Sequence, residues 1–202
     1  MFIIGLTGGI ACGKSAVADE FRNYGAVTLD IDTITHNLLK SGGKLFSTYI
    51  QHFGDGIIGE DGELDRKAVG EIIFNNEDER HWINSTAHPV ILNRVRDFLV
   101  DCAEKGEALV ILEIPLLFEA GWDFLVDETW AVYVTREKQI WRLMQRDKIT
   151  EEQARARIDA QMSPEEIAAS ADVVIHNNKK PGHIRKLILE YLIRKFVTIP
   201  FN

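Results

Sequence analysis

Five short segments of the chain are apolar at consecutive positions. They are rich in β-branched residues, which is typical of strands that are buried on both faces of a sheet. These segments are residues 2–7, 26–30, 108–115, 128–135 and 172–177. Between them, apolar residues recur every three or four positions, as in amphipathic helices. The alternation predicts an α/β fold, a five-stranded parallel sheet that helices cover on both faces.

The helical pattern extends over eight segments. They are residues 14–25, 32–40, 64–74, 77–105, 137–147, 150–161, 163–171 and about 182–196. Gly25 favours the end of the first helix, and Ser163 followed by Pro164 favours the start of another. Pro89 predicts a break in the longest segment, because proline lacks the N–H that a helix interior uses. The stretch from about 44 to 107 is expected to be mostly helical.

Glycines and polar residues follow the predicted strands at their carboxyl ends. Ligands of parallel sheets bind beyond these ends, so the same edge should hold the site. The residues that follow the five strands are 8–15, Asp30 with Asp32, 113–119, Arg136 and Asn177.

The first of these stretches is GGIACGKS, residues 8–15, which fits the pattern G-x-x-x-x-G-K-S/T in full. It stands between a predicted strand and a predicted helix, as a phosphate-binding loop requires. Glycines let the backbone N–H groups approach a polyphosphate, and the helix N-terminus favours anions. Lys14 would reach the β- and γ-phosphates, and the Ser15 hydroxyl would bind Mg²⁺. The motif predicts a nucleoside triphosphate bound with magnesium, without defining the reaction.

Asp30 and Asp32 end the second strand. A carboxylate there can accept the proton of a hydroxyl that attacks the γ-phosphate, or it can hold Mg²⁺ through water. Asp32 could also cap the helix that follows, a role compatible with either of these. Glu113 ends the third strand and resembles the second nucleotide motif of such enzymes, although aspartate is usual there; Glu113 and Glu119 could also be solvated loop acids.

Basic residues gather between positions 136 and 157. They are Arg136, Arg142, Arg146, Lys148, Arg155 and Arg157. Arg142 and Arg146 share one helix face, and Arg157 and Gln161 should share another. Guanidinium groups bind phosphate in bidentate fashion, so this pair of helices could be a lid over a nucleotide. Alternatively it is a solvated face whose arginines pair with Glu151, Glu152 and Asp159.

Composition narrows the class of protein. The chain has 202 residues and a net charge of −8, which argues against a general nucleic-acid binder. No stretch approaches the 18 apolar residues of a membrane span, and nothing resembles a signal peptide. Two cysteines are too few for a disulfide framework, so we expect a reducing, cytoplasmic location. The loop around Cys12 should be electropositive and lower the pKa of its thiol.

Seven motifs, in this order and spacing, make the chain resemble dephospho-CoA kinases. They are LTGGIACGKS, LDIDTITHNLL, GELDR…IF, AHPVI, IPLLFEAGW, R-x-x-x-R-D…R-I-x-x-Q and DVVIHNN. The resemblance implies transfer of the ATP γ-phosphoryl group to the ribose 3′-hydroxyl of dephospho-CoA, the last step of coenzyme A synthesis. It also implies one P-loop kinase domain, residues 1–202. Its core would be about 1–31, 106–137 and 168–202, with an acceptor-side helical region at about 32–105 and a lid at about 138–167.

The resemblance also implies residue roles. Asp32 matches the general base, and Lys14 and Arg142 match groups that stabilise the transferring phosphoryl group. The ATP-binding set would be Gly8, Gly9, Ala11, Cys12, Gly13, Lys14, Ser15, Ala16, Arg142 and Asn177, with Ser15 as the metal ligand. Substrate-binding positions would be Thr7, Asp32, His88, Pro115, Leu116 and Leu117. Without the family, a lone histidine such as His88 is more often structural. The implied partners are ATP and dephospho-CoA, with no nucleic acid or membrane, in a monomer or weak homo-oligomer.

The chain departs from the family pattern at three places. Ala11 and Cys12 stand where Gly-Ser is common, Ile31 replaces an alanine, and His36 replaces an arginine, so a contact of that arginine with the acceptor is in doubt. A nucleoside or nucleotide kinase would have the same loop and lid and is an alternative. A GTPase switch does not fit, because residues 178–181, NKKP, lack the aspartate of a guanine-reading motif. A protein that only binds ATP would leave Asp32 without a task.

Overall fold

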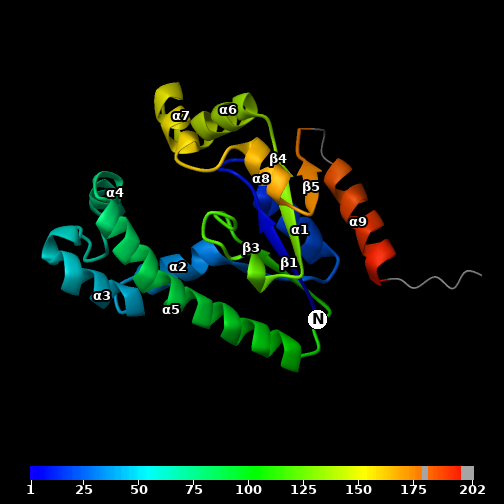
Figure 1. Ribbon diagram of the computed structural model, residues 1–202, viewed down its shortest axis with the longest axis horizontal. Coiled ribbons are helices and arrows are strands. Elements are labelled where there is room, and N and C mark those ends of the chain that lie inside the picture. The colour runs from blue at the N-terminus through cyan, green and yellow to red at the C-terminus, as the bar shows by residue number, and fades with distance from the viewer. Residues whose placement is uncertain (179–181, 197–202) are drawn as a thin grey trace, which may run out of the picture. The chain divides into compact units, whose positions relative to one another are not determined.

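The computed structural model describes residues 1–178 and 182–196, apart from the side chains of residues 66 and 73–75. Within these residues, five parallel strands form one sheet in the order β2-β3-β1-β4-β5, which confirms the predicted fold class (Figure 1). The strands are β1 (Phe2–Thr7), β2 (Val27–Asp30), β3 (Leu109–Glu113), β4 (Glu128–Tyr133) and β5 (Val173–His176). Residues 179–181, part of the stretch that argued against a GTPase, lie outside the described residues.

The chain divides into two compact units. The first consists of Met1–Leu29 and Lys105–Asn202, and the second is Asp30–Glu104. The helices of the first unit are α1 (Lys14–Asn23), α6 (Arg136–Asp147), α7 (Glu151–Asp159), α8 (Pro164–Ser170) and α9 (His183–Phe196), with a short 3-10 turn, η2 (Asp123–Leu125). The second unit contains α2 (Ile31–Leu39), α3 (Lys44–Phe53), η1 (Asp55–Ile57), α4 (Arg66–Asn75) and α5 (Glu77–Glu104).

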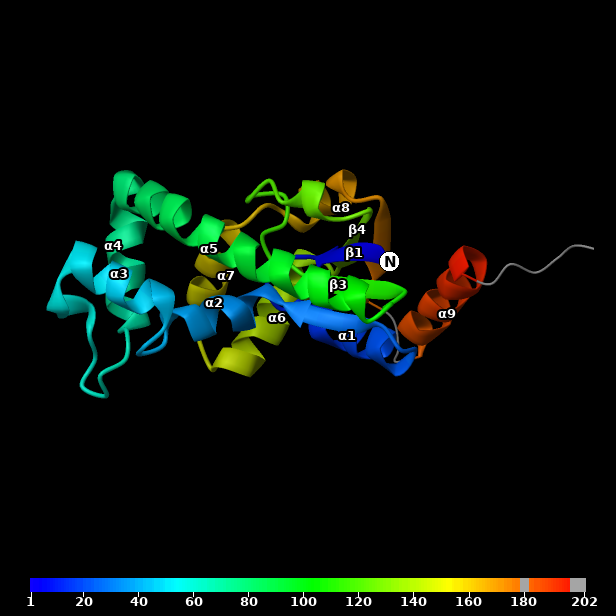
Figure 2. The same cartoon turned by 90° about the horizontal axis from the view of Figure 1, so that it is seen from below.

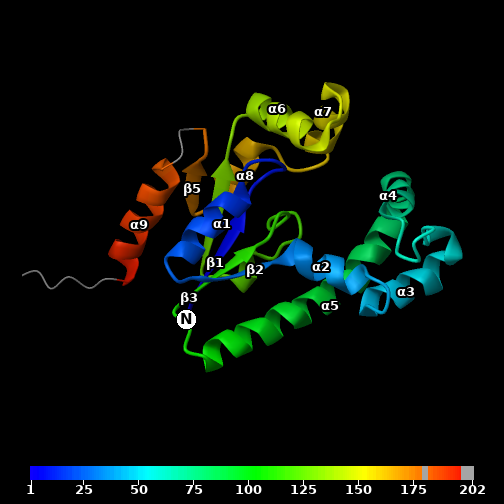
Figure 3. The same ribbon diagram turned by 180° about the vertical axis from the view of Figure 1, so that it is seen from behind.

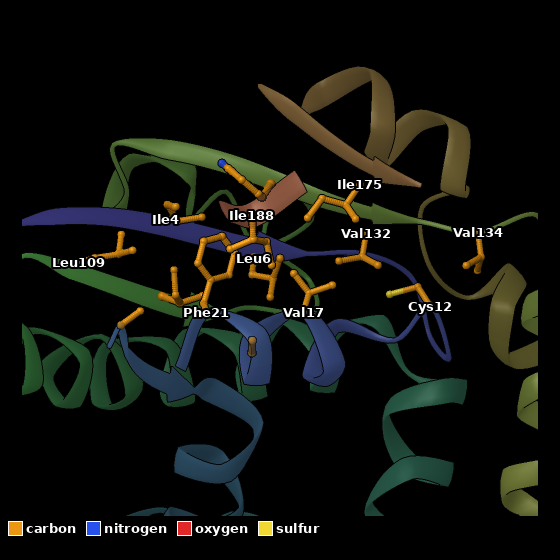
Figure 4. Close-up of a cluster of buried hydrophobic side chains, with 14 residues drawn as sticks. Ile4, Leu6, Cys12, Val17, Phe21, Leu109, Val132, Val134, Ile175 and Ile188 are labelled. Carbon is orange, nitrogen blue, oxygen red and sulfur yellow. The ribbon is translucent and has the colours of Figure 1, made fainter. Parts of the chain in front are cut away.

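One face of the sheet packs against α1 and α9. Figure 4 shows Val17 and Phe21 of α1 directed at Ile4 and Leu6 of β1, and all four side chains are fully buried. Phe21 also meets Trp130 of β4 edge to face, with ring centroids 5.2 Å apart. Large apolar side chains buried in this way hold α1 firmly, and with it the end of the loop that precedes α1.

Figure 2 shows the helices of the second unit, α2 to α5. Aromatic side chains of α3 and α5 pack together within this unit. Tyr49 and Phe53 of α3 lie against Trp82 of α5, with ring centroids 5.7 and 5.3 Å from it. His52 stacks on the same tryptophan at 3.6 Å and pairs with Glu79 at 2.7 Å. Burial raises the pKa of Tyr49 to about 12. These contacts tie α3 to α5 within the unit.

Three predicted helix features are wrong. Helix α5 continues through Pro89, because Ala87, Ile91 and Val95 on one of its faces are buried and hold both halves in line despite the missing hydrogen bond. The helix predicted at 32–40 begins at Ile31, one residue early. The helix predicted at 150–161 ends at Asp159, so Gln161 does not share a helix face with Arg157.

None of the helices in the described ranges combines the length and the apolar character that crossing a membrane requires.

Candidate functional site

The loop between β1 and α1 has an unusual backbone. Gly8 and Gly13 have φ angles of 140° and 94°, which side-chain-bearing residues rarely adopt. A Cβ at Gly8 would lie 2.5 Å from the carbonyl oxygen of Val132, and one at Gly13 would lie 2.5 Å from Asn177 Nδ2. Ala11 has a φ of 60° although it carries a Cβ. The glycines of the motif are therefore required by the path of the loop.

The loop leads into an open helix N-terminus. Gly13 is the N-cap of α1 and supplies no side chain to cap it. Lys14 Nζ donates to the carbonyl oxygen of Gly8 at 2.6 Å, so the lysine lies across the loop, and Ser15 is exposed in the first turn. Uncapped N–H groups, the helix dipole and a lysine make this end of α1 a site for anions.

Two candidates from elsewhere in the chain lie beside this loop. Arg142 of α6 donates from Nη1 to the carbonyl oxygen of Cys12 at 2.9 Å and from Nη2 to that of Asn177 at 3.2 Å. Asn177, which follows β5, donates from Nδ2 to the same Cys12 oxygen at 2.8 Å. The structure therefore brings Arg142 and Asn177 against the loop. Figure 3 shows the elements involved: α6, which carries Arg142, β5, which precedes Asn177, and α1, which follows the loop.

Two glutamines also contact the loop. Gln139 Nε2 of α6 donates to the carbonyl oxygen of Ile10 at 2.9 Å, and Gln161 Oε1 accepts from the N–H of Ile10 at 2.9 Å. Neither glutamine had a predicted role, although Gln161 ends the R-I-x-x-Q motif and was expected to share a helix face with Arg157. A signal for Gln139 was present, since it lies three residues before Arg142 and thus on the same helix face.

The expected low pKa of Cys12 is wrong. Its side chain is 1% exposed, and burial raises the pKa of the thiol, which outweighs the lowering influence of Lys14 and Arg142. The thiol packs in the hydrophobic core instead of facing the loop's anion site (Figure 4).

The remaining candidates of the first unit lie after β1 and β3. Thr7 is 1% exposed, and its Oγ1 donates to the carbonyl oxygen of Pro115 at 3.2 Å. Leu116 is 44% exposed, whereas Leu117 is fully buried in the core. Glu113 is buried and accepts a hydrogen bond from Arg22 Nη2 at 3.3 Å, so it is not a solvated loop acid.

In the second unit, Asp30 and not Asp32 caps α2. Asp30 accepts from the N–H of Asp32 at 2.9 Å and from the Thr33 hydroxyl at 3.0 Å. The cap proposed for Asp32 is therefore wrong, and Asp32 lies within the first turn. His88 lies on α5, where burial lowers the pKa of its imidazole. Helices α2 and α5 pack against each other, so the unit holds both residues on packed helices.

Most of the arginines between 136 and 157 have carboxylate partners. The pairs are Arg146 and Arg157 with Asp147, Arg155 with Glu151, and Arg136 with Asp159. Hydrogen bonds from Arg146, together with both guanidinium charges, lower the pKa of Asp147. These exposed pairs agree with the solvated-face alternative and contribute little each. Arg142 differs, because it binds backbone carbonyls of the loop.

The described residues contain no group of three His, Cys, Asp or Glu side chains that could hold a metal ion. Mg²⁺ at phosphotransfer sites keeps several water ligands and is bound largely by substrate phosphates. The exposed hydroxyl of Ser15 beside the anion site fits such an ion, which a nucleotide would bring with it.

Comparison with known proteins decides the family. A family model described as dephospho-CoA kinase matches residues 2–182. The chain belongs to the dephospho-CoA kinase family. A dephospho-CoA kinase of Carboxydothermus hydrogenoformans is 42% identical over 94% of this chain and 92% of its own, and one of Geobacter sulfurreducens is 39% identical over 97% and 100%. Family membership makes the chain a kinase of coenzyme A biosynthesis.

Solved structures agree with the fold of this family. The dephospho-CoA kinase of Campylobacter jejuni is 29% identical, with a TM-score of 0.67 over 94% of both chains. A Thermus thermophilus protein, TT1252, is 30% identical, with a TM-score of 0.83 over 98% of both chains. A shikimate kinase of Acinetobacter baumannii, 18% identical with a TM-score of 0.52 over 98% of this chain and 96% of its own, shares the fold alone.

Proposed function

We propose that this enzyme transfers the γ-phosphoryl group of ATP to the ribose 3′-hydroxyl of dephospho-CoA, giving coenzyme A and ADP. The observation that carries the proposal is the loop between β1 and α1, where an uncapped helix N-terminus and Lys14 meet at one place in a chain of this family. Backbone N–H groups at a helix N-terminus, together with a lysine, suit the phosphates of a nucleotide.

Loop residues would surround the phosphates of ATP. They are Gly8, Gly9, Ala11, Cys12, Gly13, Lys14, Ser15 and Ala16. Lys14 would exchange its bond to the Gly8 carbonyl for the β- and γ-phosphates, and Ser15 would hold Mg²⁺. When bound, Mg²⁺ neutralises charge on the phosphate oxygens. Arg142 and Asn177, already beside the loop, would complete the nucleotide side.

Asp32 would be the general base that takes the proton of the 3′-hydroxyl. Because Asp30 caps α2, the helix does not need Asp32 for this purpose. Thr7, His88, Pro115, Leu116 and Leu117 are proposed to contact the acceptor; of the two leucines, Leu116 has the side chain that solvent reaches.

We also propose that the chain has the three functional regions that the family implies. The sheet and its covering helices form the core, residues of about 32–105 bind the acceptor, and residues of about 138–167 form a lid that carries Arg142 over the phosphates. We expect the enzyme to work in the cytoplasm on these small molecules.

A coupled assay of ADP release with Mg²⁺-ATP tests the function, with dephospho-CoA, adenosine and AMP compared as acceptors. Turnover confined to dephospho-CoA, with a product heavier by one phosphate at the ribose, is expected. Turnover of adenosine or AMP would support a nucleoside or nucleotide kinase instead. Absence of turnover with all three would contradict the acceptor assignment.

A further inference from the structure

Both polar backbone atoms of Ile10, at the tip of the phosphate-binding loop, are bound by glutamine side chains. Gln139 Nε2 donates to its carbonyl oxygen, and Gln161 Oε1 accepts from its N–H, each at 2.9 Å. The two glutamines come from different segments, α6 and the residues after α7. Loop peptides that face solvent need no such partners, so this double contact sets Ile10 apart.

Gln139 is placed here with little freedom. The side chain of Gln139 is 1% exposed. If residue 9 had a Cβ, that atom would lie 2.5 Å from Gln139 Nε2, so the absence of a side chain at Gly9 allows α6 to approach the loop. The amide can be oriented in one way, because the carbonyl of Ile10 needs a donor. Gln139 Oε1 then has no hydrogen-bond partner among the described protein atoms. A buried orphan acceptor lowers stability, so an apolar residue would serve a purely structural role better.

The side chain of Ile10 is anchored to the same helices. It packs with Ala11 against a cluster of α6 and α7 that consists of Ile140, Leu143, Ala154 and Ile158. The tip of the loop and the α6–α7 pair are thus joined by two hydrogen bonds and by apolar contacts. A displacement of the helix pair would displace Ile10 with it.

We propose that Gln139 and Gln161 are positioning residues that clamp Ile10 and thereby direct the other N–H groups of the loop at the phosphates of ATP. The N–H of Ile10 is committed to Gln161, which leaves the phosphates to the N–H groups of the residues on either side. The inference rests on the proposed function in one respect, that the loop binds ATP.

Gln161→Met removes the acceptor at a half-buried position and should leave the fold intact. We expect faster hydrogen exchange of the Ile10 amide in the nucleotide-free protein and a KM for ATP raised roughly three- to tenfold, as one lost hydrogen bond predicts, with the KM for dephospho-CoA unchanged. Gln161→Glu keeps an acceptor, so the Ile10 amide should stay as protected as in the parent. Gln145→Met, the same change at an exposed position of α6, is the matched control and should change none of these values.

Gln139→Met removes the donor and the orphan oxygen together. The Ile10 carbonyl loses its donor as the orphan oxygen disappears, so the two changes offset each other. A positioning role therefore predicts a melting temperature close to that of the parent, together with a KM for ATP raised to a similar extent. A structural role would instead lower the melting temperature and leave the KM for ATP unchanged.

Parent-like Ile10 exchange and ATP affinity in both methionine variants would overturn the clamp. Because exchange is measured without nucleotide or acceptor, this result is separate from the acceptor assay, which tests the proposed function itself.

Discussion

Helices α1 and α2 each follow a β-strand, and they differ in how the free N–H groups of their first turn are satisfied. The junction of β1 and α1 uses a loop of residues 8–13 and ends at Gly13, which offers the helix no side-chain cap. The junction of β2 and α2 has no intervening residue, and the side chain of Asp30 caps the helix. One helix therefore begins with its N–H groups unused by side chains, and the other begins with a carboxylate already bound to them.

The difference decides which ligand each junction suits. The positive end of a helix attracts anions when nothing else occupies it, as at α1. At α2, Asp30 fills this place, and Asp32 adds a second negative charge in the first turn. An anion would be repelled there, whereas a hydroxyl that must lose a proton would find an acceptor. In the proposed reaction, the first junction would receive phosphate and the second would offer a base.

The strongest test of this contrast is Asp32→Asn. The amide keeps the shape of the side chain but cannot accept the proton, so kcat should fall by about 10²–10⁴-fold, while the affinity for ATP stays unchanged. Steady-state rates and calorimetric ATP titration measure both quantities. A variant that turns over at the parent rate would remove Asp32 as the base. Asp30→Asn is the matched control, because asparagine caps a helix as well as aspartate.

Lys14→Ala tests the phosphate-receiving junction. Loss of a charge-assisted contact with the phosphates should weaken ATP binding by about tenfold to a hundredfold and lower turnover with it. The same calorimetric titration gives the affinity. Lys67→Ala, at an exposed position of α4, should leave the affinity for ATP as it is. An unchanged affinity in Lys14→Ala would place the phosphates elsewhere.

The variant Asp30→Ala tests whether the capping side chain of Asp30 stabilises the folded protein. Removal of an aspartate N-cap should lower the free energy of unfolding by about 1 kcal/mol, measured by chemical denaturation. In Asp30→Asn most of this stability should be retained. Equal losses in the two variants would mean that the negative charge, and not the capping hydrogen bond, stabilises α2.

Sequence patterns predicted the architecture well because strands and phosphate loops have local signatures. Apolar runs located all five strands, and the glycine motif located the loop whose backbone requires these glycines. Features that depend on tertiary contacts were missed or wrong. The helix through Pro89 depends on burial of one face, the pKa of Cys12 depends on packing under the loop, and the role of Gln139 depends on where α6 lies. The cap at Asp30 was missed although its signal was local, because Asp32, two residues on, is an equally good capping residue and was predicted instead.

The variant Ala11→Gly, for which we expect the smallest effect, tests whether the backbone of the loop between β1 and α1 is strained at residue 11. Ala11 adopts a φ of 60°, where a Cβ costs about 1–2 kcal/mol, and glycine adopts this angle freely. Glycine also loses more entropy on folding, by about 0.5–1 kcal/mol, which offsets part of the gain. The free energy of unfolding should therefore rise by up to about 1 kcal/mol, as denaturation would measure, with the affinity for ATP unchanged. Gly25→Ala, at a φ of 87° away from the loop, should change stability in the opposite direction. A loss of stability in Ala11→Gly would show that contacts of the Ala11 methyl group with the α6–α7 cluster outweigh the backbone strain.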